Sequence, residues 1–348
     1  ARHLEEKKVA VELGSAVMGF EETGDGLLVR TESGRAFPAE LVILSVGVRP
    51  EVTLAEAASL QLGDLGGIRV DESMRTSDPQ IWAVGDAVEV RDVVTGQWCL
   101  APLAGPANRQ GRIAADSICG RESKFRGVQG TLICGCLGLT VAMTGASEKR
   151  LRDVGISDFL AVYLHPGNHA GYYPGARPIH MKVLFSNHDG RVLGAQAVGA
   201  EGVDKRIDGI SLALQMGASI YDLAEAELCY APQFGAAKDP VNLAGMVAAN
   251  VLRGDLPLAD WRELDNTTAF LLDVREPTEF ARDHLDGAVN IPLSQLRDRH
   301  GELPRDREIW INCALGQRSY YAVRFLAQKG FRVRNLPGGL MTWWGFSG

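Results

Sequence analysis

A cysteine placed between a predicted strand and a predicted helix constrains this chain more than any other feature. The apolar run Ile309 to Asn312 predicts a strand, Cys313 follows it, and the pattern after a short loop predicts a helix from about Arg318. Loop N–H groups and a helix N-terminus attract anions, so they favour a nucleophilic thiolate at Cys313. Arg318 would brace the loop or hold an anionic substrate. The alternative is a buried structural cysteine.

The length and net charge of the chain exclude several classes of protein. The 348 residues suffice for two to three domains, and a net charge of −7 without a basic cluster argues against nucleic-acid binding. Six cysteines exclude a disulfide scaffold and suit a reducing cytoplasm. No apolar stretch reaches the length of a membrane span, so we expect a cytoplasmic protein without a membrane partner.

Two further segments stand beside the cysteine loop. They are "LLDVREPTEFARDHLDGAVNIPL" at 271–293 and "LPGGLMTWWG" at 336–345. With the loop, they resemble the rhodanese family over residues 261–348. The resemblance implies that Cys313 carries a persulfide and passes sulfane sulfur between thiols. By the same resemblance, Arg318 is catalytic and the persulfide is held by Ala314, Leu315, Gly316, Gln317 and Ser319.

Details of the loop refine this expectation. The loop from Cys313 to Arg318 has the six positions of rhodaneses, not the longer loop of phosphatases with the same fold. Its interior has no basic residue, so strong thiosulfate binding is not expected. We interpret Asp273 and Arg275 as a structural salt bridge.

The first half of the chain reads as mixed strands and helices. Turn signals predict a meander of hairpins in residues 1–50, and the runs 41–46 and 81–85 predict buried strands. A helix is expected from about Ala104 to Gly120. Further strands are expected at 159–164, 181–186 and 192–198, and further helices at 204–216 and 241–252.

Two short motifs in this half indicate a flavin site. Gly85 ends the predicted strand 81–85 and is followed by Asp86 and Ala87, and the helix is opened by Pro102, Leu103 and Ala104. A carboxylate after a glycine accepts hydrogen bonds from sugar hydroxyls, and free helix N–H groups face an electron-rich ligand. With "VILSVGVRPE" at 42–51, these motifs resemble flavoprotein disulfide reductases with two dinucleotide folds. The resemblance implies that the two motifs contact FAD.

The middle of the chain carries a second resemblance. Residues 165–176 and 227–255 resemble the dimerisation domain of coenzyme A-disulfide reductases and NADH-dependent persulfide reductases. This implies a homodimer formed through 122–252, in which Tyr172 and Tyr230 reach the partner's active site and act there as catalytic residues near the reacting sulfur. Filling space at an interface is the alternative role for both tyrosines. His165, His169 and His180 have no metal-ligand spacing, so no metal is expected.

These segments predict a multidomain α/β and α+β protein. The expected parts are the remnant of an NAD(P)H-binding domain at 1–52, the end of an FAD-binding domain at 53–121, a dimerisation domain at 122–252, a linker at 253–260 and a rhodanese domain at 261–348. The resemblance implies an FAD- and NAD(P)H-dependent reductase of coenzyme A disulfide, coenzyme A persulfide or polysulfide. No Gly-x-Gly-x-x-Gly fingerprint opens a strand–helix unit here, so we expect the chain alone to hold FAD weakly. The alternatives are a non-redox dimeric sulfur carrier or sensor, and an NADH oxidase-like flavoprotein.

Overall fold

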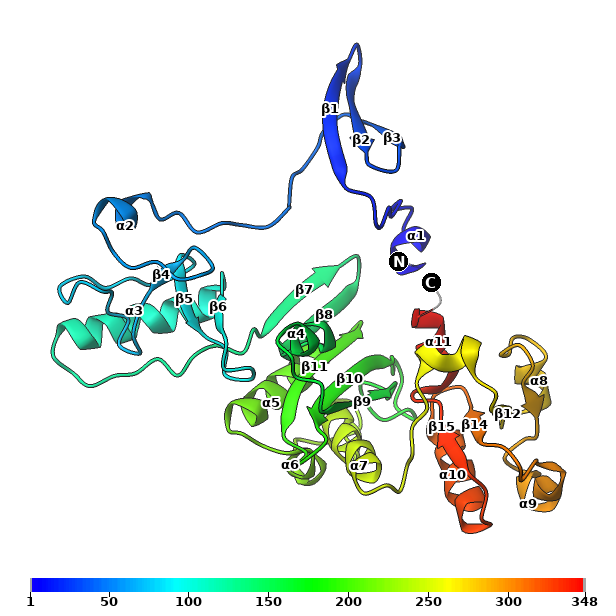
Figure 1. Cartoon of the computed structure of the whole chain (residues 1–348). Coiled ribbons are helices and arrows are strands. Elements are labelled where there is room, and N and C mark those ends of the chain that lie inside the picture. Colours follow the sequence, from blue (N-terminus) through cyan, green and yellow to red (C-terminus); the bar gives the residue numbers. More distant parts are fainter. Residues whose placement is uncertain (1, 347–348) are drawn as a thin grey trace.

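The computed structural model describes residues 2–346 and separates them into successive units along the chain (Figure 1). The N-terminal unit is an exposed arm. It contains α1 (Arg2–Glu6), β1 (Val17–Thr23), β2 (Gly26–Thr31) and β3 (Ala36–Ala39). The strands pair antiparallel in the order β1-β2-β3, which confirms the predicted meander.

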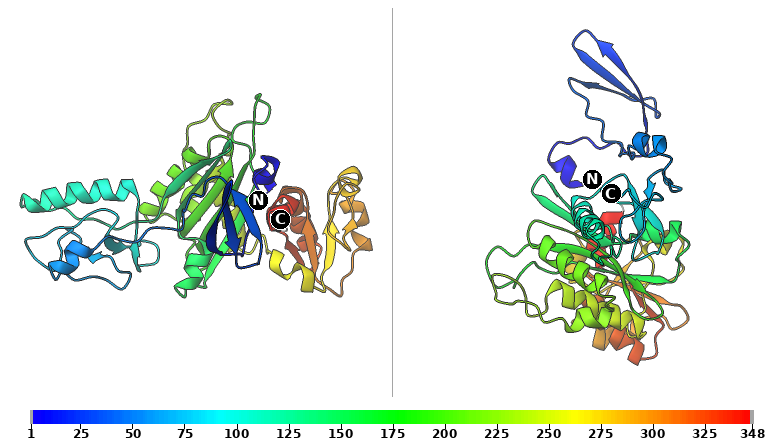
Figure 2. Two further views of the ribbon diagram at one scale, coloured as in Figure 1. Left: turned by 90° about the horizontal axis from the view of Figure 1, so that it is seen from above. Right: turned by 90° about the vertical axis from the view of Figure 1, so that its left-hand side faces the viewer.

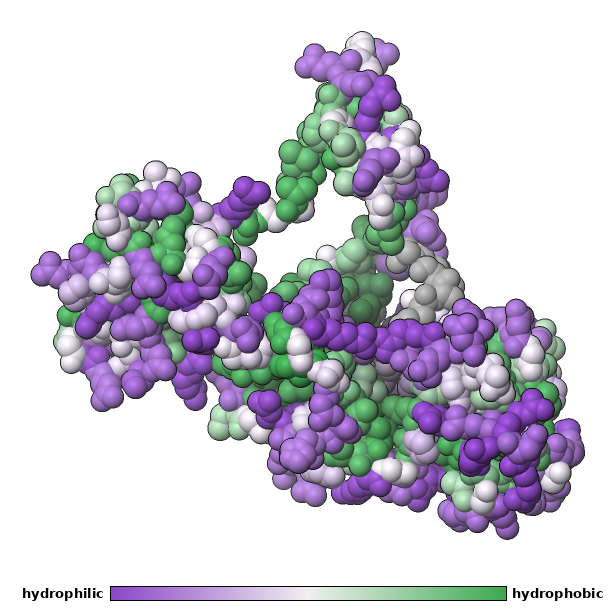
Figure 3. Space-filling view, viewed as in Figure 1, coloured by the Kyte–Doolittle hydropathy of each residue, from purple (hydrophilic) through white to green (hydrophobic). Residues whose placement is uncertain are grey.

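The apolar run 41–46 is not a strand, contrary to the prediction. It belongs to an extended connection that leads from the arm to the next unit, where Figure 3 shows hydrophobic residues exposed along a thin strip. Leu41, Ile43 and Val46 are 76%, 81% and 90% exposed. A strand needs a neighbour for its backbone hydrogen bonds, and no strand in residues 2–346 lies beside this run.

The second unit packs short strands against one long helix. Its elements are α2 (Thr53–Ala57), β4 (Ile68–Arg69), β5 (Val88–Arg91), β6 (Trp98–Leu100) and α3 (Ala104–Ile118). Val88, Val90, Ala114 and Phe125 belong to its core. The helix prediction is confirmed, whereas the predicted strand 81–85 is wrong. Only the isolated bridge Arg75↔Trp82 pairs that run with other backbone among the described residues, and the ladder begins at Val88 instead.

The central unit is an antiparallel sheet covered by helices. Its strands are β7 (Leu132–Cys136), β8 (Leu139–Gly145), β9 (Phe159–Leu164), β10 (Ile179–Ser186) and β11 (Val192–Gly199), in the order β7-β8-β11-β10-β9. Its helices are α4 (Glu148–Asp153), α5 (Val203–Gln215), α6 (Ile220–Glu225) and α7 (Pro240–Leu252). Both α5 and α7 contact the sheet, and together they enclose the largest core of the described chain. The strands and helices expected between 159 and 252 are confirmed.

The C-terminal unit is a parallel sheet with helices around it, seen at the right of Figure 1. Its strands are β12 (Phe270–Asp273), β13 (Val289–Asn290), β14 (Ile309–Asn312) and β15 (Val333–Asn335), in the order β13-β12-β14-β15. Its α-helices are α8 (Pro277–Phe280), α9 (Leu296–Arg299), α10 (Gln317–Gln328) and α11 (Gly339–Phe346). Two 3-10 helices, at Trp261–Asn266 and His300–Glu302, complete it.

The C-terminal unit is docked against the central one, and the views of Figure 2 agree on this arrangement. Val247 and Val251 of α7 pack against the cores of both units. Residues 256–259 join the C-terminal unit, because Asn335 donates to the Pro257 carbonyl and Leu256 is 3% exposed. Within the part of the chain that the structure describes, no helix is both long and apolar enough to span a bilayer.

Candidate functional site

The sulfur of Cys313 lies at the carboxyl end of β14, where the chain turns into α10. Cys313 is 1% exposed. Its Sγ accepts a hydrogen bond from the Gly316 N–H at 3.1 Å and lies 3.4 Å from Ser319 Oγ. Gly316 is the residue that precedes α10, so the positive end of the helix dipole is directed at this loop. The helix begins at Gln317, close to the predicted start.

The loop that carries Cys313 is hydrogen-bonded to α11. Leu340 and Met341 donate backbone hydrogen bonds to the carbonyls of Cys313 and Ala314, at 2.9 and 3.1 Å. This close approach requires glycine at position 339, where φ is +63° and a Cβ would lie 2.3 Å from the Cys313 oxygen. The segment 336–345 therefore holds the cysteine loop in place by direct contact.

Arg318 braces the loop. Among the described residues, its guanidinium makes no hydrogen bond to the Cys313 sulfur. Its guanidinium makes two hydrogen bonds to Glu279 of α8, at 2.6 and 2.7 Å. These bonds lower the pKa of Glu279 to about 2, and they also raise the pKa of Arg318. Of the two predicted roles, bracing is the one that the geometry supports.

A buried ion pair supports the neighbouring strand. Asp273 at the end of β12 is fully buried, and Arg275 donates to both of its carboxylate oxygens. Asn312, the residue before Cys313, donates to the same carboxylate at 3.0 Å. The Asp273–Arg275 pair is structural, as predicted, and it links β12 to the base of the cysteine loop.

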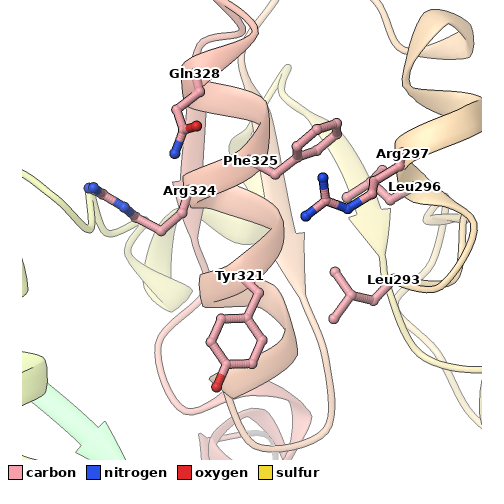
Figure 4. Close-up of a pocket in the computed structure, with 7 residues that line it drawn as sticks. All are labelled: Leu293, Leu296, Arg297, Tyr321, Arg324, Phe325 and Gln328. Atoms are coloured by element: carbon pink, nitrogen blue, oxygen red, sulfur yellow. The ribbon is translucent and has the colours of Figure 1, made fainter.

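A separate cavity of about 440 Å³ lies beside α10 (Figure 4). Tyr321, Arg324 and Gln328 extend from α10, while Leu293 and Arg297 face it from the neighbouring segment. Neither Cys313 nor residues 314–316 line it. We therefore do not assign it to the sulfur chemistry.

The glycine–aspartate motif is hydrogen-bonded to α3. Gly85 has φ +90°, and nothing lies within 4 Å of a Cβ built there, so a ligand can approach the backbone. The Gly85 N–H donates at 2.7 Å to Gln110, whose side chain is 1% exposed. Asp86 is exposed and has no hydrogen-bond or ion-pair partner among the described residues. Ala87 links this motif to β5.

The Pro102–Ala104 turn opens α3 without a capping side chain. Leu103 is the N-cap residue in an extended conformation, and no side chain accepts the first N–H groups of the helix. Free N–H groups at a helix start suit an electron-rich ligand edge. Together with the unpaired Asp86 carboxylate, this arrangement fits a flavin with a hydroxylated side chain.

The two tyrosines predicted from separate segments meet on the surface of the central unit. The Tyr172 and Tyr230 hydroxyl oxygens are 3.0 Å apart. Both side chains are exposed, at 77% and 48%. The hydrogen bond with Tyr172, which the neutral Tyr230 phenol can donate, raises the pKa of Tyr230. The pair and Cys313 lie in different units of the chain.

The three histidines serve packing and hydrogen bonding. His165 joins its Nδ1 to His180 Nδ1 at 2.8 Å and its Nε2 to Thr342 Oγ1 at 2.8 Å. His169 contacts the Pro174 carbonyl at 3.2 Å. Within residues 2–346, no group of three or more His, Cys, Asp or Glu side chains is arranged to hold a metal ion.

Sequence reasoning missed four residues that organise these sites. Glu279 and Gln110 are polar partners that no motif singled out. Arg206 and Asp239 form a buried ion pair in the central unit. Arg206 had a detectable signal, since its position in α5 lies on the face of the buried Val203, Ile207 and Ile210, where an arginine is unexpected.

The fold and the two sites define a class: a rhodanese-like unit attached to the C-terminal part of a disulfide-reductase fold. Residues 1–110 match the family "Pyridine nucleotide-disulphide oxidoreductase", residues 134–240 match its dimerisation domain, and residues 258–345 match the rhodanese-like domain. The chain therefore belongs to the pyridine nucleotide-disulphide oxidoreductase family and carries a rhodanese-like domain.

Solved structures support this assignment over nearly the whole chain. Reduced Bacillus anthracis CoADR-RHD has a TM-score of 0.94 and 43% identity, covering 97% of this chain and 61% of that one. A NAD-dependent persulfide reductase from A. fulgidus has a TM-score of 0.91 and 38% identity, covering 98% and 62%.

Curated relatives agree at the level of the family. An NADH oxidase of Methanocaldococcus jannaschii is 39% identical over 61% of this chain and 46% of its own length. An NAD(P)H sulfur oxidoreductase (CoA-dependent) of Pyrococcus furiosus is 36% identical over 63% and 48%. The chain thus spans about half the length of the curated relatives that it matches.

Proposed function

We propose that Cys313 transfers sulfane sulfur within an FAD- and NAD(P)H-dependent reductase of coenzyme A persulfide, coenzyme A disulfide or polysulfide. The observation that carries the proposal is the position of Cys313 Sγ beneath the Gly316 N–H, at the start of α10. A hydrogen bond and a helix dipole both stabilise a negative charge on sulfur.

The transfer step needs no net oxidant. The Cys313 thiolate attacks the terminal sulfur of a persulfide R–S–SH, so that a new S–S bond forms at Sγ while the donor S–S bond breaks and the thiol RSH leaves. An acceptor thiolate then removes the outer sulfur by the same exchange and restores Cys313. Because Cys313 is 1% exposed, we expect residues 314–316 to move aside when a donor enters.

The reductase half is proposed from the second unit. In the complete enzyme, Asp86 and the Pro102–Ala104 turn would hold FAD, which supplies electron transfer from NAD(P)H when bound. The balanced overall reaction is RS–SH + NAD(P)H + H⁺ → RSH + H₂S + NAD(P)⁺. An NADH oxidase reaction gives no role to the cysteine loop, so we favour the sulfur substrates.

The tyrosine pair is proposed to act near the reacting sulfur of the partner subunit in a homodimer. Neutral phenols donate hydrogen bonds or protons to a departing thiolate. The exposure of both side chains leaves them free to reach another subunit. The match of 134–240 to a dimerisation domain supports this arrangement. We also propose a cytoplasmic location, in keeping with six unpaired cysteines.

The proposal is tested by treating the chain with glutathione persulfide and analysing its peptides by mass spectrometry. We expect one added sulfur atom on Cys313, loss of transfer to an acceptor thiol in Cys313→Ser, and normal transfer in the matched control Cys119→Ser, which changes an exposed cysteine. An unmodified Cys313 would overturn the transfer role. Transfer by Cys313 in a full-length enzyme that never binds flavin would instead support a non-redox sulfur carrier.

A further inference from the structure

Two long loops carry the tyrosine pair, and each is fixed at its base. The first loop, residues 165–178, joins β9 to β10 and carries Tyr172. The second, residues 226–239, joins α6 to α7 and carries Tyr230. The phenol oxygens are 3.0 Å apart although both side chains are exposed, so their separation depends on how the loops are held.

One guanidinium connects the bases of both loops. Arg206 of α5 is 2% exposed. Its Nη2 donates to the Asn168 carbonyl at 2.8 Å, in the first loop, and to Asp239 Oδ2 at 2.8 Å, in the second. Its Nε donates to Asp239 Oδ1 at 3.2 Å, which makes the contact with the carboxylate bidentate.

Each partner of Arg206 is itself fixed in the fold. Asp239 accepts the Val241 N–H and so caps α7. Asn168 accepts the Arg177 N–H through its side chain at 2.8 Å, which closes the base of the first loop. Arg206 therefore joins the two loop bases at residues that are themselves hydrogen-bonded to the surrounding fold.

Close packing extends from this centre toward the tyrosines. The Ala170 N–H donates to the Gly235 carbonyl at 2.8 Å, so the two loops are paired directly between Arg206 and the phenols. A Cβ at Gly235 would lie 3.7 Å from Arg206 Nη2, in ordinary contact. A shift at the guanidinium would therefore pass to both loops.

Stability alone does not explain an ion pair at this depth. Burying a charged pair costs desolvation, and well-packed apolar residues of similar volume usually stabilise a core equally well. What arginine adds is a planar set of donors in fixed directions, and lysine cannot reproduce that set. The geometry of the bonds is thus the distinctive contribution of Arg206.

We propose that Arg206 is a positioning residue for the tyrosine pair: through Asp239 and the Asn168 carbonyl, it holds Tyr172 and Tyr230 within hydrogen-bond distance. The proposal rests on the proposed function in so far as the pair serves sulfur chemistry. It predicts that the phenol–phenol hydrogen bond is lost when the guanidinium is replaced, even though neither tyrosine touches Arg206.

The test follows the phenolate absorbance of the 348-residue chain with pH, in each protein and in its Tyr230→Phe derivative. The difference reports the titration of the Tyr172–Tyr230 pair, whose mutual hydrogen bond raises the pKa of Tyr230. Tyr172→Phe should return the pKa of Tyr230 toward its ordinary value. Three further variants should do the same: Arg206→Lys, Arg206→Met and Asp239→Asn. The control Arg191→Met makes the same change at an exposed arginine and should keep it.

The proposal would be overturned if the pKa of Tyr230 stays raised in folded Arg206→Lys and Asp239→Asn. These milder variants decide the matter if Arg206→Met does not fold, since Lys keeps the charge and Asn keeps an acceptor for the α7 cap. Circular dichroism identifies the folded variants.

Kinetics of the complete enzyme separate this inference from the proposed function. If the pair serves the sulfur step, Tyr230→Phe slows persulfide reduction by ~10- to 1,000-fold. Arg206→Lys should then lower kcat with little change in KM, and the double variant should be no slower than Tyr230→Phe. If Tyr230→Phe is as fast as the parent enzyme, the proposed role of the tyrosines in the sulfur step is wrong. The positioning role of Arg206 is then tested by the titration alone.

Discussion

At the scale of single residues, the bond between Arg318 and Glu279 determines how firmly the cysteine loop is held. We predict that Glu279→Gln lowers the stability of the chain near neutral pH by about 1 kcal/mol, a value reduced for solvent screening because both side chains are about one-third exposed. We also expect slower sulfur transfer by Cys313, because a displaced loop places the sulfur poorly.

The sign of the pH dependence follows from the lowered pKa of Glu279. The carboxylate is stabilised in the folded state, so its contribution is present above pH 4.5 and is lost as the pH falls through about 2. Urea unfolding of the parent and Glu279→Gln should therefore converge on acidification. The matched control is Glu302→Gln, at the exposed pair with Arg299. A parent–variant difference that persists unchanged in acid would contradict the assignment.

At the scale of secondary-structure elements, Asp273 links β12 to β14 beneath the loop. Removing one partner of a buried pair leaves an uncompensated charge, so Asp273→Asn should cost ~3–5 kcal/mol in urea unfolding. Asp260→Asn, at the exposed pair with Arg262, should cost less than ~1 kcal/mol. Equal losses in the two variants would show that the buried pair adds nothing.

The sequence predicts those helices and strands whose hydrophobic pattern lies within the segment itself. The sequence predicts the strand at 159–164 and a helix from about 104 to 120, observed at 104–118, because hydrophobic periodicity is a property of the segment itself. The runs 41–46 and 81–85 are just as apolar but lack strand partners in the described chain, and pairing is not a local property. The loop around Cys313 is likewise predictable because its strand–loop–helix pattern is local. Its partner Glu279 is not predictable, because that contact joins segments distant in the sequence.

At the scale of the whole molecule, the exposed aromatic side chains of the central unit indicate a second copy as their cover. Tyr172, Tyr173 and Phe234 are 77%, 43% and 67% exposed. We predict that sedimentation equilibrium gives about twice the chain mass of 37.5 kDa. Phe234→Glu should weaken the dimer by ~100- to 10,000-fold, since burying a large apolar side chain contributes ~1.5–3 kcal/mol in each of the two subunits. The control Tyr321→Glu, in the C-terminal unit, should not. A monomer at every concentration would refute this prediction.

The docking of the C-terminal unit should also depend on pH. His165 lies where β9 of the central unit meets α11 of the C-terminal unit, and it bonds Thr342 across the boundary. A cavity of about 500 Å³ at this boundary is lined by Tyr163, His180 and Trp344, among others. Burial, with a smaller effect of His180, lowers the pKa of His165 from 6.5 to about 4.

A lowered histidine pKa means that the folded state resists protonation. Stability should therefore be full above pH 6.5, fall by roughly 2–3 kcal/mol between pH 6.5 and about 4, and lose nothing more from this group at lower pH. His165→Gln should flatten much of this dependence, and the exposed control His188→Gln should leave it unchanged. Thermal unfolding between pH 7 and 4 checks the prediction. If the boundary is where protonation acts, limited proteolysis near residues 253–260 should accelerate over the same pH range in the parent chain but not in His165→Gln.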